Sequence, residues 1–575
     1  MHQRLTNRQV AEMLQQIADM LEIKGEVVYK SLAYRRAAQS ILDLGRDINE
    51  VHAEGGLRSI PGVGEALGKK LDELLSTGHL QYFEELQEEV PPGVVSLLAI
   101  PEVGPKTAKL LWQRLGAMSV ADVEQAAQAG KLRELPGLGA KTEQRILEGI
   151  RSLNRRSSRV LLGLAWPVAE ELLEQLQALP GVQAASAAGS LRRMKETVGD
   201  LDLLAAATDG EAVTAAFARF PQVAEVMLQG PTKATVILQD GLQADLRVLP
   251  RERWGSLLQH FTGSKEHNVA LRALALEKGL SLSEYGFKRG QEEILCPEEK
   301  DVYRLLGLEW IPPELREDRG EIAAAAEGRL PALVTIDDIM GDLHAHTDWS
   351  DGVAPLEDMA AAARELGYEY LAITDHTHSL AVANGLTVER LREQRKLIDH
   401  FNAYHAGIKL LQGCELEICG DGSLDFPDEV LAGLDVVVAS VHTGLRQERA
   451  RMTERVLRAV RNPHVDVIGH LTGRNLGGRE PSNVDVEAVL QEAARTGTAI
   501  EINGAPNRLD LNDVHTKRAV ELGVTLCIGS DAHSVMSLHA MRYGLATARR
   551  GWASAKNVLN TRSYAELMKW LRGRK

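Results

Sequence analysis

Two acidic residues separated by one leucine, Asp200 and Asp202, end the segment 189–202. The sequence of this segment is Gly-Ser-Leu-Arg-Arg-Met-Lys-Glu-Thr-Val-Gly-Asp-Leu-Asp. Successive side chains on a strand point to opposite faces, so both carboxylates lie on one face and can share divalent cations. A third acidic candidate, Asp245, lies in the strand-like run 242–248. Carboxylates that hold metal ions beside arginines that hold phosphate suit phosphoryl or nucleotidyl transfer, although a bare Asp-x-Asp pair also occurs at ordinary polar strand ends.

A second set of metal-binding residue types follows residue 341, where most of the 17 histidines lie. It opens with Asp-Leu-His-Ala-His at 342–346, and short apolar strands that end in polar residues follow. These strand segments are 371–376, 410–417, 435–442, 465–470, 499–503 and 525–533. Helical patterns such as 356–366 separate most of them, which is typical of a closed (β/α) barrel with ligands at its strand ends. Imidazoles and carboxylates together suit Zn²⁺, Mn²⁺ or iron and leave the ion's identity open.

Composition sets the bounds on the whole chain. At 575 residues the chain is too long for one core, so roughly three to five domains are expected. A formal charge of −14 argues against a uniformly basic nucleic-acid coat but leaves room for local basic surfaces. The four cysteines show no paired ligand spacing and suit a reducing compartment. With neither a leader segment nor a membrane-spanning apolar run in view, we expect a soluble, cytoplasmic protein.

Three Gly-rich turns of one form precede helical segments in the first part of the chain. They are Ile-Pro-Gly-Val-Gly at 60–64, Ile-Pro-Glu-Val-Gly at 100–104 and Leu-Pro-Gly-Leu-Gly at 135–139. Each resembles a helix-hairpin-helix, in which backbone N–H groups at a helix N-terminus hold a phosphate without reading the bases. A single copy is commonly a mere helix connector, whereas three favour non-specific DNA binding, even if one pair serves as scaffold. The expected contacts are Gly62, Gly64, Gly104, Lys106, Gly137, Gly139 and Lys141.

The whole pattern at 189–202 resembles the signature of nucleotidyltransferases, and specifically of the family X DNA polymerases. This resemblance implies that Asp200 and Asp202 bind two Mg²⁺ or Mn²⁺ ions and that Asp245 helps to activate the primer 3′-hydroxyl. It also identifies the surrounding α+β segment as the polymerase palm. The carboxylate triad would then serve nucleotide addition to DNA.

The segment 260–268, His-Phe-Thr-Gly-Ser-Lys-Glu-His-Asn, resembles the nucleotide-selection segment of the same family. Together with the palm motif, it implies nucleotide contacts from Ser190, Arg193, Gly199, Phe261, Gly263, Asn268 and Arg272. His260 and Lys265 stand where the vertebrate enzyme has a tyrosine and an acidic residue. Discrimination against ribonucleotides is therefore left open. An ordinary surface position is the alternative for His260 and His267.

The N-terminal region resembles the small N-terminal domain of vertebrate DNA polymerase beta. The resemblance places Lys70 at the position of the Schiff-base lysine and Lys30 at that of a supporting phosphate-binding, DNA-contacting lysine. The implied chemistry is β-elimination of a deoxyribose-5-phosphate, which needs an amine of lowered pKa. Ala66 departs from the pattern, because the vertebrate enzyme has a basic residue there. A solvated helix lysine remains the alternative for Lys70.

The C-terminal strand–helix series resembles the PHP (polymerase and histidinol phosphatase) domain, usually a distorted seven-stranded barrel. The implied ligand groups are His344, His346, Glu415 and Asp531 for one ion, Glu415, His442 and His470 for a second, and Asp351, His376 and His533 for a third. Such a cluster neutralises the charge of a phosphoester and activates water, which predicts phosphodiester or phosphomonoester hydrolysis. Asn503, Arg508 and His378 are further candidates for substrate contacts.

These segments predict a multidomain α/β protein with helical helix-hairpin-helix domains, an α+β nucleotidyltransferase palm and a distorted (β/α)7 PHP barrel. The expected divisions are a lyase-like helical domain at 1–90, a fingers-like domain at 91–157, the palm at 158–249, a nucleotide-selecting thumb at 250–315, a partly helical linker at 316–340 and the PHP domain at 341–575. The polymerase resemblance thus covers the first half of the chain, and the PHP resemblance covers the second.

The combined interpretation is a bacterial family X DNA polymerase that fills short gaps in base excision repair. Its PHP domain is expected to act as a 3′–5′ exonuclease and 3′-end processor, with abasic-site incision as a further activity. The implied partners are gapped or nicked duplex DNA and deoxynucleoside triphosphates, bound by a monomer that associates with the nucleoid during repair. Mg²⁺ or Mn²⁺ is expected at the palm, and up to three Mn²⁺, Zn²⁺ or iron ions at the barrel. Two alternatives remain for the PHP domain, a small-molecule phosphatase and a non-catalytic scaffold.

Overall fold

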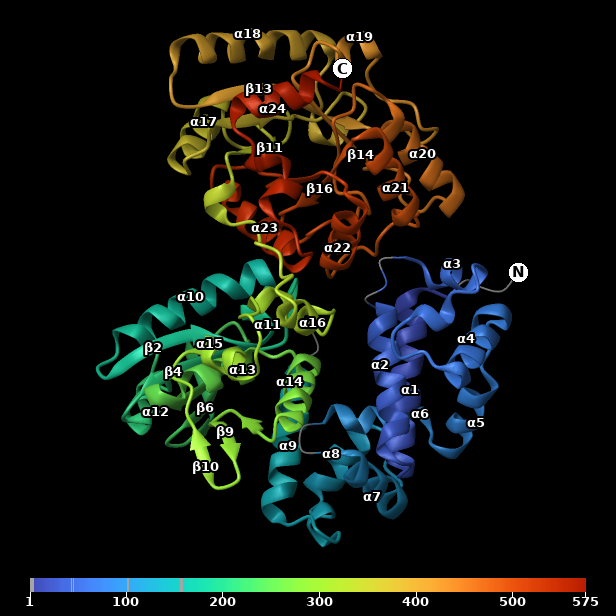
Figure 1. Cartoon of the computed structure of the whole chain (residues 1–575), viewed down its shortest axis with the longest axis vertical. Helices are drawn as coiled ribbons and strands as arrows, with labels where there is room; N and C mark the ends of the chain where they lie inside the picture. The colour runs from blue at the N-terminus through green and yellow to red at the C-terminus, as the bar shows by residue number, and fades with distance from the viewer. Residues whose placement is uncertain (1–4, 43, 45, 101–102, 156–158, 575) are drawn as a thin grey trace. The chain divides into compact units, whose positions relative to one another are not determined.

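The computed structural model describes residues 5–42, 44, 46–100, 103–155 and 159–574. The chain divides into two compact units, Met1–Ser158 and Arg159–Lys575 (Figure 1). The predicted boundary at 157–158 and part of the second Gly-rich turn, 101–102, lie outside the described residues. No helix in the described part of the chain is long and apolar enough to cross a membrane.

The first unit consists, over its described residues, of helices packed around one core. Its α-helices are α1 (Asn7–Lys24), α2 (Val28–Leu42), α3 (Ile48–Ala53), α4 (Glu65–Thr77), α5 (Gln81–Glu89), α6 (Pro92–Ser96), α7 (Pro105–Leu115), α8 (Val120–Gln128) and α9 (Ala140–Arg155). Thr6 caps α1 at its start, and Gly25 ends it in the left-handed conformation. Val10, Leu14 and Ile17 of α1, at helical spacing, contribute to the buried core.

The three Gly-rich turns share several features over their described residues. Short 3₁₀ helices, η1 (Leu57–Ser59), η2 (Leu97–Ala99) and η3 (Leu132–Glu134), precede the turns that lead into α4, α7 and α9. The apolar turn residues Val63, Val103 and Leu138 are buried, whereas the adjacent glycines are exposed. Each turn therefore anchors itself in the core and presents the start of a helix, with its unpaired backbone N–H groups, to solvent.

The second unit begins with a five-stranded sheet in the order β2-β4-β7-β6-β5. Its strands are β2 (Val182–Ala187), β4 (Leu201–Ala207), β5 (Val223–Gln229), β6 (Lys233–Leu238) and β7 (Gln243–Leu249). Leu203 and Ala205 of β4 pack with α10 (Leu162–Ala178) and α12 (Gly210–Phe217) on one face. Leu204 and Ala206 pack with α13 (Trp254–Thr262) on the other face. This alternation keeps the strand buried on both faces.

A smaller layer of helices and strands follows this five-stranded sheet, which lies in the segment expected to be the palm. It comprises α14 (Lys265–Glu277), β8 (Ser281–Ser283), β9 (Gly286–Arg289), β10 (Glu292–Ile294) and α15 (Glu299–Leu305). The segment 316–340, for which the sequence predicts a linker, contains α16 (Glu321–Ala326) and packs onto this layer through Ala325. Its charged residues Arg316 and Glu321 are 0% exposed. The part of this segment up to Ala325 is therefore packed into a core, whereas most of 326–337 is exposed.

Seven parallel strands form the C-terminal barrel in the order β11-β12-β13-β14-β15-β16-β17. The strands are β11 (Gly341–Ala345), β12 (Tyr370–Ile373), β13 (Lys409–Glu417), β14 (Val436–Ser440), β15 (Val467–Ile468), β16 (Ala499–Asn503) and β17 (Leu526–Gly529). A parallel bridge between Ala345 and Ala532 brings the last strand beside the first, so the barrel is nearly closed. The predicted fold class is confirmed.

Helices surround the barrel and close one of its ends (Figure 1). The main ones are α17 (Leu356–Glu365), α18 (Val388–Tyr404), α20 (Arg449–Arg461), α21 (Val486–Thr496), α22 (Asp513–Leu522), α23 (Met541–Arg550) and α24 (Tyr564–Arg572). Leu567 and Leu571 of α24 share a core cluster with Tyr370, Val436 and Ala499, each of which is the first residue of its strand. α24 therefore covers the amino-terminal ends of the strands and leaves the carboxyl ends for chemistry.

The palm and the barrel pack directly against each other within the second unit. Leu509, Ala540 and Tyr543 of the barrel belong to the same core cluster as the palm helix α10. A Cβ atom added to Gly163 of α10 would lie 2.4 Å from Pro506 Cβ, so a glycine is needed for this close approach. The two halves of this unit are joined by an apolar interface as well as by ion pairs.

Candidate active sites

The three acidic candidates of the palm meet at two neighbouring strands. β4 and β7 are parallel, and their register pairs Asp202 with Asp245, while Asp200 immediately precedes β4. Burial, followed by the charges of Asp200 and Asp245, raises the pKa of Asp202 to about 7. These carboxylates repel one another, and a hard divalent ion bound between them would relieve that repulsion.

Neighbouring groups hold two of these carboxylates in place. Asp245 Oδ1 accepts a hydrogen bond of 2.5 Å from Thr235 Oγ1, and Asp245 Oδ2 accepts one of 2.6 Å from Gln243 Nε2. Asp202 packs against Gly189, whose φ is +57° and where an added Cβ would lie 2.0 Å from Asp202 Oδ2. A residue with a side chain at that position would therefore displace the carboxylate.

The residues implied to hold nucleotide phosphates lie around one pocket of about 420 Å³. Ser190 and Arg193 line it, together with Lys195 and Arg159. Gly199 is close to the same group, because a Cβ added there would lie 3.6 Å from Arg159 Nη1. The concentration of cations fits an anionic ligand such as a polyphosphate.

The nucleotide-selection segment adjoins this pocket at Gly263. Arg193 Nη1 donates a 2.5 Å hydrogen bond to the carbonyl oxygen of Thr262 and lies 3.0 Å from the Cβ position of Gly263. Asn268, further along, is 8% exposed; its side chain accepts a hydrogen bond from Gln259 Nε2 at 2.8 Å and donates one to a backbone carbonyl. The structure thus brings Arg193 and Gly263 together and holds Asn268 in a buried amide pair.

Phe261, His267 and Arg272, three other residues in and after this segment, each contact a different partner. The Arg247 guanidinium lies 4.5 Å from the centroid of the Phe261 ring, and Arg272 Nε donates to the Asn268 carbonyl oxygen at 3.2 Å. His267 is 0% exposed, with its Nδ1 2.6 Å from Glu321 Oε1. The surface alternative for His267 is therefore wrong, because its ring completes the packing of the segment 316–340.

The nine candidate ligands of the barrel lie at the carboxyl ends of its strands. His344 and Glu415 are within β11 and β13, and the remaining seven follow strand ends. Six of the nine side chains are 9% exposed or less, namely His344, His346, His376, Glu415, His470 and Asp531. Parallel strands of a barrel end at one edge, which is why ligands far apart in the sequence converge there.

These ligands form three groups whose ligand atoms lie within 4.8 Å of one another. The groups are His344, His346, Glu415 and Asp531; His346, Asp351, His376 and His533; and His376, Glu415 and His442. The first group matches the implied set, and His346 joins the second. In the third group, His376 takes the place expected of His470, whose Nε2 lies 2.8 Å from Glu415 Oε1.

The chemistry of these side chains fits metal ions. His344 Nε2, His346 Nε2 and His442 Nε2 are buried and have no hydrogen-bond partner among the described residues. Burial lowers the pKa of the His346 imidazole to about 4, so the ring is neutral at pH 7 and offers a lone pair. His442 differs, because the lowering effect of burial on its pKa is outweighed by the Glu415 and Glu417 carboxylates, which raise it to about 10. A metal ion would therefore have to displace a proton from this ring. Imidazoles and shared carboxylates together are the donor set of Zn²⁺, Mn²⁺ and iron sites.

Two carboxylates that no motif indicates orient the histidine ligands. Glu501 Oε1 lies 2.6 Å from His344 Nδ1, and Glu417 Oε2 lies 2.7 Å from His442 Nδ1. A carboxylate on Nδ1 fixes the tautomer that leaves Nε2 free for a metal. Glu501 belongs to β16, so its place in an apolar strand is the signal that the sequence offers.

The weaker candidates fall in two places. Asn503 Nδ2 lies 3.0 Å and Arg508 Nε 3.3 Å from Asp531 Oδ2. Both therefore contact a ligand carboxylate and sit at the edge of the site. His378 Nδ1 instead lies 3.3 Å from Asp425 Oδ2.

Models of known families match four parts of the chain. They are a helix-hairpin-helix domain at 5–80, a SAM-like helix-hairpin-helix tandem at 94–152, a DNA polymerase beta thumb at 257–317 and a PHP domain at 342–505. The "DNA polymerase/3'-5' exonuclease PolX" of Bacillus subtilis (strain 168) is 37% identical over 569 residues, which are 98% of this chain and 99% of that protein. The chain belongs to the family X DNA polymerases that carry a C-terminal PHP domain.

Other relatives of this family X polymerase match one half each. DNA polymerase lambda of Rattus norvegicus is 28% identical over 345 residues, covering 54% of this chain and 56% of that protein. A probable phosphatase of Thermoanaerobacter sp. (strain X514) is 29% identical over 232 residues, covering 38% of this chain and 89% of that protein. The predicted family is confirmed, and with it an enzyme that depends on divalent metal ions.

In the first unit of this polymerase, Lys70 lies in an aromatic environment. Its Nζ donates a 2.7 Å hydrogen bond to Tyr34 Oη and lies 3.0 Å from the centroid of the Tyr82 ring. Burial lowers the pKa of Lys70 to about 8. Lys30, the other implied lysine, forms an exposed ion pair with Glu26 at 2.9 Å. The nucleophile candidate therefore has the lowered pKa that Schiff-base chemistry needs.

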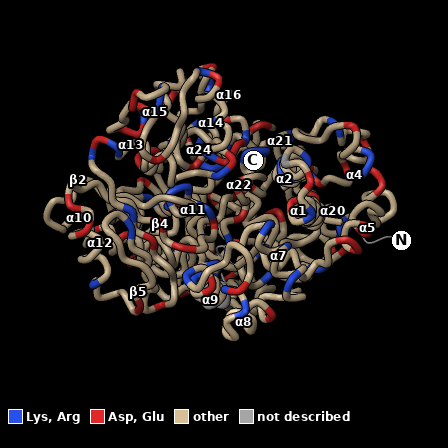
Figure 2. Tube along the Cα trace, turned by 90° about the horizontal axis from the view of Figure 1, so that it is seen from below, with Lys and Arg blue, Asp and Glu red and all other residues tan. Residues whose placement is uncertain are grey.

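The helix-hairpin-helix residues are accessible for DNA contacts. Gly62, Gly64, Gly104, Lys106, Gly137, Gly139 and Lys141 are all exposed. Cβ atoms added to Gly64, Gly104 and Gly139 would meet nothing within 4 Å, so the absence of a side chain leaves room for a ligand. Elsewhere basic and acidic residues are interspersed along the described chain (Figure 2). The chain as a whole carries a net charge of −14.

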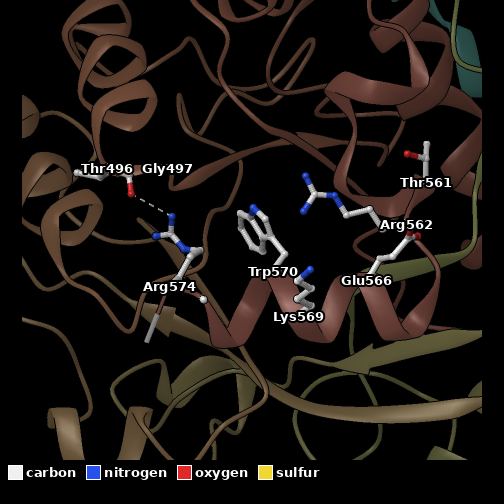
Figure 3. Close-up of a pocket in the computed structure, with 9 residues that line it drawn as sticks. Thr496, Gly497, Thr561, Arg562, Glu566, Lys569, Trp570 and Arg574 are labelled. Carbon is white, nitrogen blue, oxygen red and sulfur yellow. Dashed lines mark hydrogen bonds between the residues drawn. The ribbon is translucent and has the colours of Figure 1, made fainter.

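A further pocket lies at the opposite end of the barrel from the metal ligands (Figure 3). Trp570 of α24 lies between the Arg562 and Arg574 guanidinium groups, 5.7 Å and 5.2 Å from its ring centroid. Arg574 donates hydrogen bonds to the Thr496 carbonyl oxygen and to Thr498 Oγ1. These contacts attach α24 and Arg574 to the barrel, so the residues that line this pocket have a structural role.

Proposed function

We propose that this protein fills short gaps in damaged DNA and processes 3′ ends with its PHP domain. The observation that supports this best is the presence of two separate metal-ligand sets in one packed unit. One is a carboxylate set on β4 and β7, and the other is an imidazole and carboxylate set at the barrel edge. A repair enzyme with both could clean a 3′ end and then extend it.

In the polymerase site, Asp200 and Asp202 would hold two Mg²⁺ or Mn²⁺ ions, with Asp245 beside the primer 3′-hydroxyl. When bound, such ions stabilise the attacking and leaving oxygens of an in-line displacement. Asp245, which Thr235 and Gln243 hold by hydrogen bonds, would accept the hydroxyl proton. The gap-filling reaction would then join the 3′ oxygen to the α-phosphorus and release pyrophosphate.

The remaining polymerase residues position the nucleotide. Ser190 and Arg193 would contact its phosphates at the pocket that they line. Gly199 would lie beside them, close to Arg159. The sugar and base would meet the nucleotide-selection segment, namely Phe261, Gly263, Asn268 and Arg272. Gly263 allows the backbone to approach the sugar closely, because it adds no side chain beside Arg193. Positioning of this kind supplies much of the rate enhancement in phosphoryl transfer.

In the PHP site, the nine ligands would hold up to three Mn²⁺, Zn²⁺ or iron ions. When bound, these ions neutralise phosphodiester charge and lower the pKa of water. Glu501 and Glu417 keep the His344 and His442 rings oriented for coordination. The name of the B. subtilis relative includes 3′–5′ exonuclease activity. We assign the same reaction to this site, with incision at abasic sites as an additional activity.

The first unit would hold gapped or nicked duplex DNA. Its exposed turn glycines and the lysines Lys106 and Lys141 suit contacts with the sugar–phosphate backbone. Lys70 would form the Schiff base of a deoxyribose-phosphate lyase, and Lys30 would support the phosphate. We assign a monomer as the working form.

A gapped duplex with a 5′-labelled primer tests the two-site assignment. The wild-type protein would be compared with Asp200→Ala/Asp202→Ala and with His344→Ala in Mn²⁺, with and without nucleotides. We expect the double Asp variant to lose extension and keep primer shortening, and His344→Ala to do the reverse. If either variant lost both activities while retaining its wild-type Tm, the assignment of independent sites would be wrong.

A small-molecule phosphatase is the second candidate for the PHP domain, because relatives that match this part are named probable phosphatases. Packing of the barrel against the palm disfavours it, since a phosphatase of small substrates needs no polymerase partner. The discriminating comparison is kcat/KM for p-nitrophenyl phosphate against that for a single-stranded oligonucleotide. A strong preference for the aryl phosphate would favour the phosphatase.

A further inference from the structure

A buried arginine of the barrel reaches the polymerase pocket. Arg550, the last residue of α23, is 4% exposed. Its Nη1 donates hydrogen bonds to the Arg193 carbonyl oxygen at 2.6 Å and to Glu317 Oε1 at 3.0 Å. Its Nη2 donates to Asp513 Oδ2 at 2.5 Å. One guanidinium from the PHP domain therefore bonds the backbone of a palm residue that borders the expected phosphate site.

Glu317 links this arginine to the side chain of the same palm residue. Its Oε1 also accepts a 3.0 Å hydrogen bond from Arg193 Nε, and its Oε2 lies 3.8 Å from Lys195 Nζ. Burial alone would raise the pKa of Glu317, but the nearby cations, Arg550 foremost, lower it to about 2. Glu317 is therefore an anion held between cations of the palm and of the barrel.

The contacts with described residues orient the Arg193 side chain but use only part of its hydrogen-bonding capacity. Its Nη1 donates to the Thr262 carbonyl oxygen and its Nε donates to Glu317. These bonds use two of the five N–H groups of a guanidinium, and the side chain lines the pocket shared with Ser190 and Arg550. The position of the remaining N–H groups depends on how Glu317 and the backbone of Arg193 are held.

Loss of Arg550 would affect the two ends of the network differently. Asp513 would keep a second partner, Arg319 Nη1, at 3.0 Å. The Arg193 carbonyl oxygen would lose the donor described above, and Glu317 would lose a buried countercharge. Buried groups that lose a partner pay their desolvation cost without compensation, so they move to find another. The displacement is thus expected on the polymerase side.

We propose that Arg550 of the PHP domain is a positioning residue for the polymerase site, holding Arg193 directly through its backbone and indirectly through Glu317. This proposal rests on the proposed function of the palm as a nucleotidyltransferase. It makes nucleotide addition dependent on the barrel's presence, although Arg550 lies outside the three ligand groups of the PHP site. A displaced phosphate-binding group weakens nucleotide binding and alignment without removing the metal ligands.

The test compares Arg550→Met with Arg542→Met in the full-length protein. Arg542 is on the same helix and pairs with Glu170 of the palm at 3.4 Å, so it controls for loss of an interface ion pair. Single-nucleotide gap filling is measured at varied nucleotide concentration, and primer shortening is measured on the same DNA. For Arg550→Met we expect kcat/KM for the nucleotide to fall about tenfold to a hundredfold, mainly through KM. Primer shortening, and both activities of Arg542→Met, should change less than about twofold.

A double-substitution cycle separates positioning from general loss of structure. If Arg550 acts through Arg193, adding Arg550→Met to Arg193→Ala should lower kcat/KM by less than about twofold further. An undiminished additional loss, or an unchanged KM in the single variant, would overturn the proposal.

If Arg550→Met also lost primer shortening, Arg550→Lys would be used. Lysine keeps the charge but lacks the planar fork whose two terminal nitrogens span the three acceptors. An intermediate KM is therefore expected, and a wild-type KM would again overturn the proposal. Absence of nucleotide addition by the wild type would instead refute the proposed function.

Discussion

The carboxyl groups of Asp202 and Asp245 belong to directly paired residues of two parallel strands, β4 and β7. In most sheets such a pairing of acidic residues would destabilise the protein, because like charges on adjacent strands repel. Here the repulsion, together with burial, shows in the raised pKa of Asp202. The palm therefore has a built-in requirement for positive charge at this point.

Metal-free protein should lose stability as pH rises because of Asp202. Its pKa is raised from 3.8 to about 7 in the folded state, so the unfolded chain releases this proton first and folding weakens between these values. Asp202→Asn removes the effect, and we expect its Tm in a chelator to exceed that of the wild type by about 2–4 °C at pH near 8. Calorimetry from about pH 5 to about pH 8 measures the difference.

The same experiment has a metal arm and a control. Mg²⁺ should raise the Tm of the wild type more than that of Asp202→Asn, since it relieves the repulsion. Glu211→Gln, an exposed acidic position on α12 of the palm, should follow the wild type in both respects. Parallel pH profiles for wild type and Asp202→Asn would contradict the raised pKa.

Glu501→Gln should weaken metal binding at the PHP site without removing a ligand. Glu501 Oε1 lies 2.6 Å from His344 Nδ1, and an amide in its place binds that N–H less strongly. Losses at such supporting positions are typically about tenfold to a hundredfold in metal affinity. Competition with a chromophoric chelator measures the Mn²⁺ affinity, and primer shortening should recover at saturating Mn²⁺.

Glu521→Gln is the matched control for this substitution. Glu521 is a half-exposed carboxylate of α22 that pairs with Arg518 at 3.3 Å. Its substitution should leave Mn²⁺ affinity within about twofold of the wild type. Equal losses in both variants would mean that Glu501 supports only the fold of the barrel.

Borohydride trapping on an abasic substrate should depend on Lys70. The pKa of this amine is lowered to about 8, principally by burial. Trapping should therefore rise with pH and level off just above pH 8, whereas an ordinary lysine would need a pH near 10.5. Lys70→Ala should lose the adduct, and Lys69→Ala, its exposed neighbour, should keep it. An undiminished adduct in Lys70→Ala would assign the chemistry to another amine.

DNA affinity should fall uniformly across sequences when a helix-hairpin-helix lysine is removed. Lys106→Ala and Lys141→Ala should each reduce the slope of log K against log salt concentration by about 0.9, the value for one phosphate contact on duplex DNA. Lys131→Ala, exposed but outside the turn, serves as control. Fluorescence anisotropy between about 50 and about 200 mM salt gives the slopes. A slope unaltered in both turn variants would assign these turns to scaffolding.

Residues within contiguous motifs could be predicted, because strand alternation and strand ends dictate where they point. Asp200 and Asp202 lie at the start of β4, and His344 and His346 lie at the end of β11, so local periodicity is enough to predict that each pair acts together. Their supporting residues could not be predicted in the same way. Glu501 lies in β16, far along the chain from His344, and only the closed barrel brings them within hydrogen-bond distance.

Charged residues of the segment 316–340 illustrate the opposite limit. The Ala-rich, charged stretch predicts a partly helical linker, and α16 supplies the helix. Arg316 and Glu321 are nevertheless buried, because Glu299 and His267 provide partners from other elements. Arg159 was similarly missed as a pocket residue, since a basic run before the first palm helix resembles any helix end. Burial of a charge depends on partners that are distant in sequence, and no local pattern encodes them.

The last helix of the chain closes the barrel whose first strand begins at residue 341. Leu567 and Leu571 of α24 complete the cluster that contains Leu343 of β11. During synthesis the barrel's apolar interior therefore stays open until α24 has left the ribosome. A chain that lacks only this helix would present that interior to chaperones and proteases, so quality control would act on the barrel as a whole.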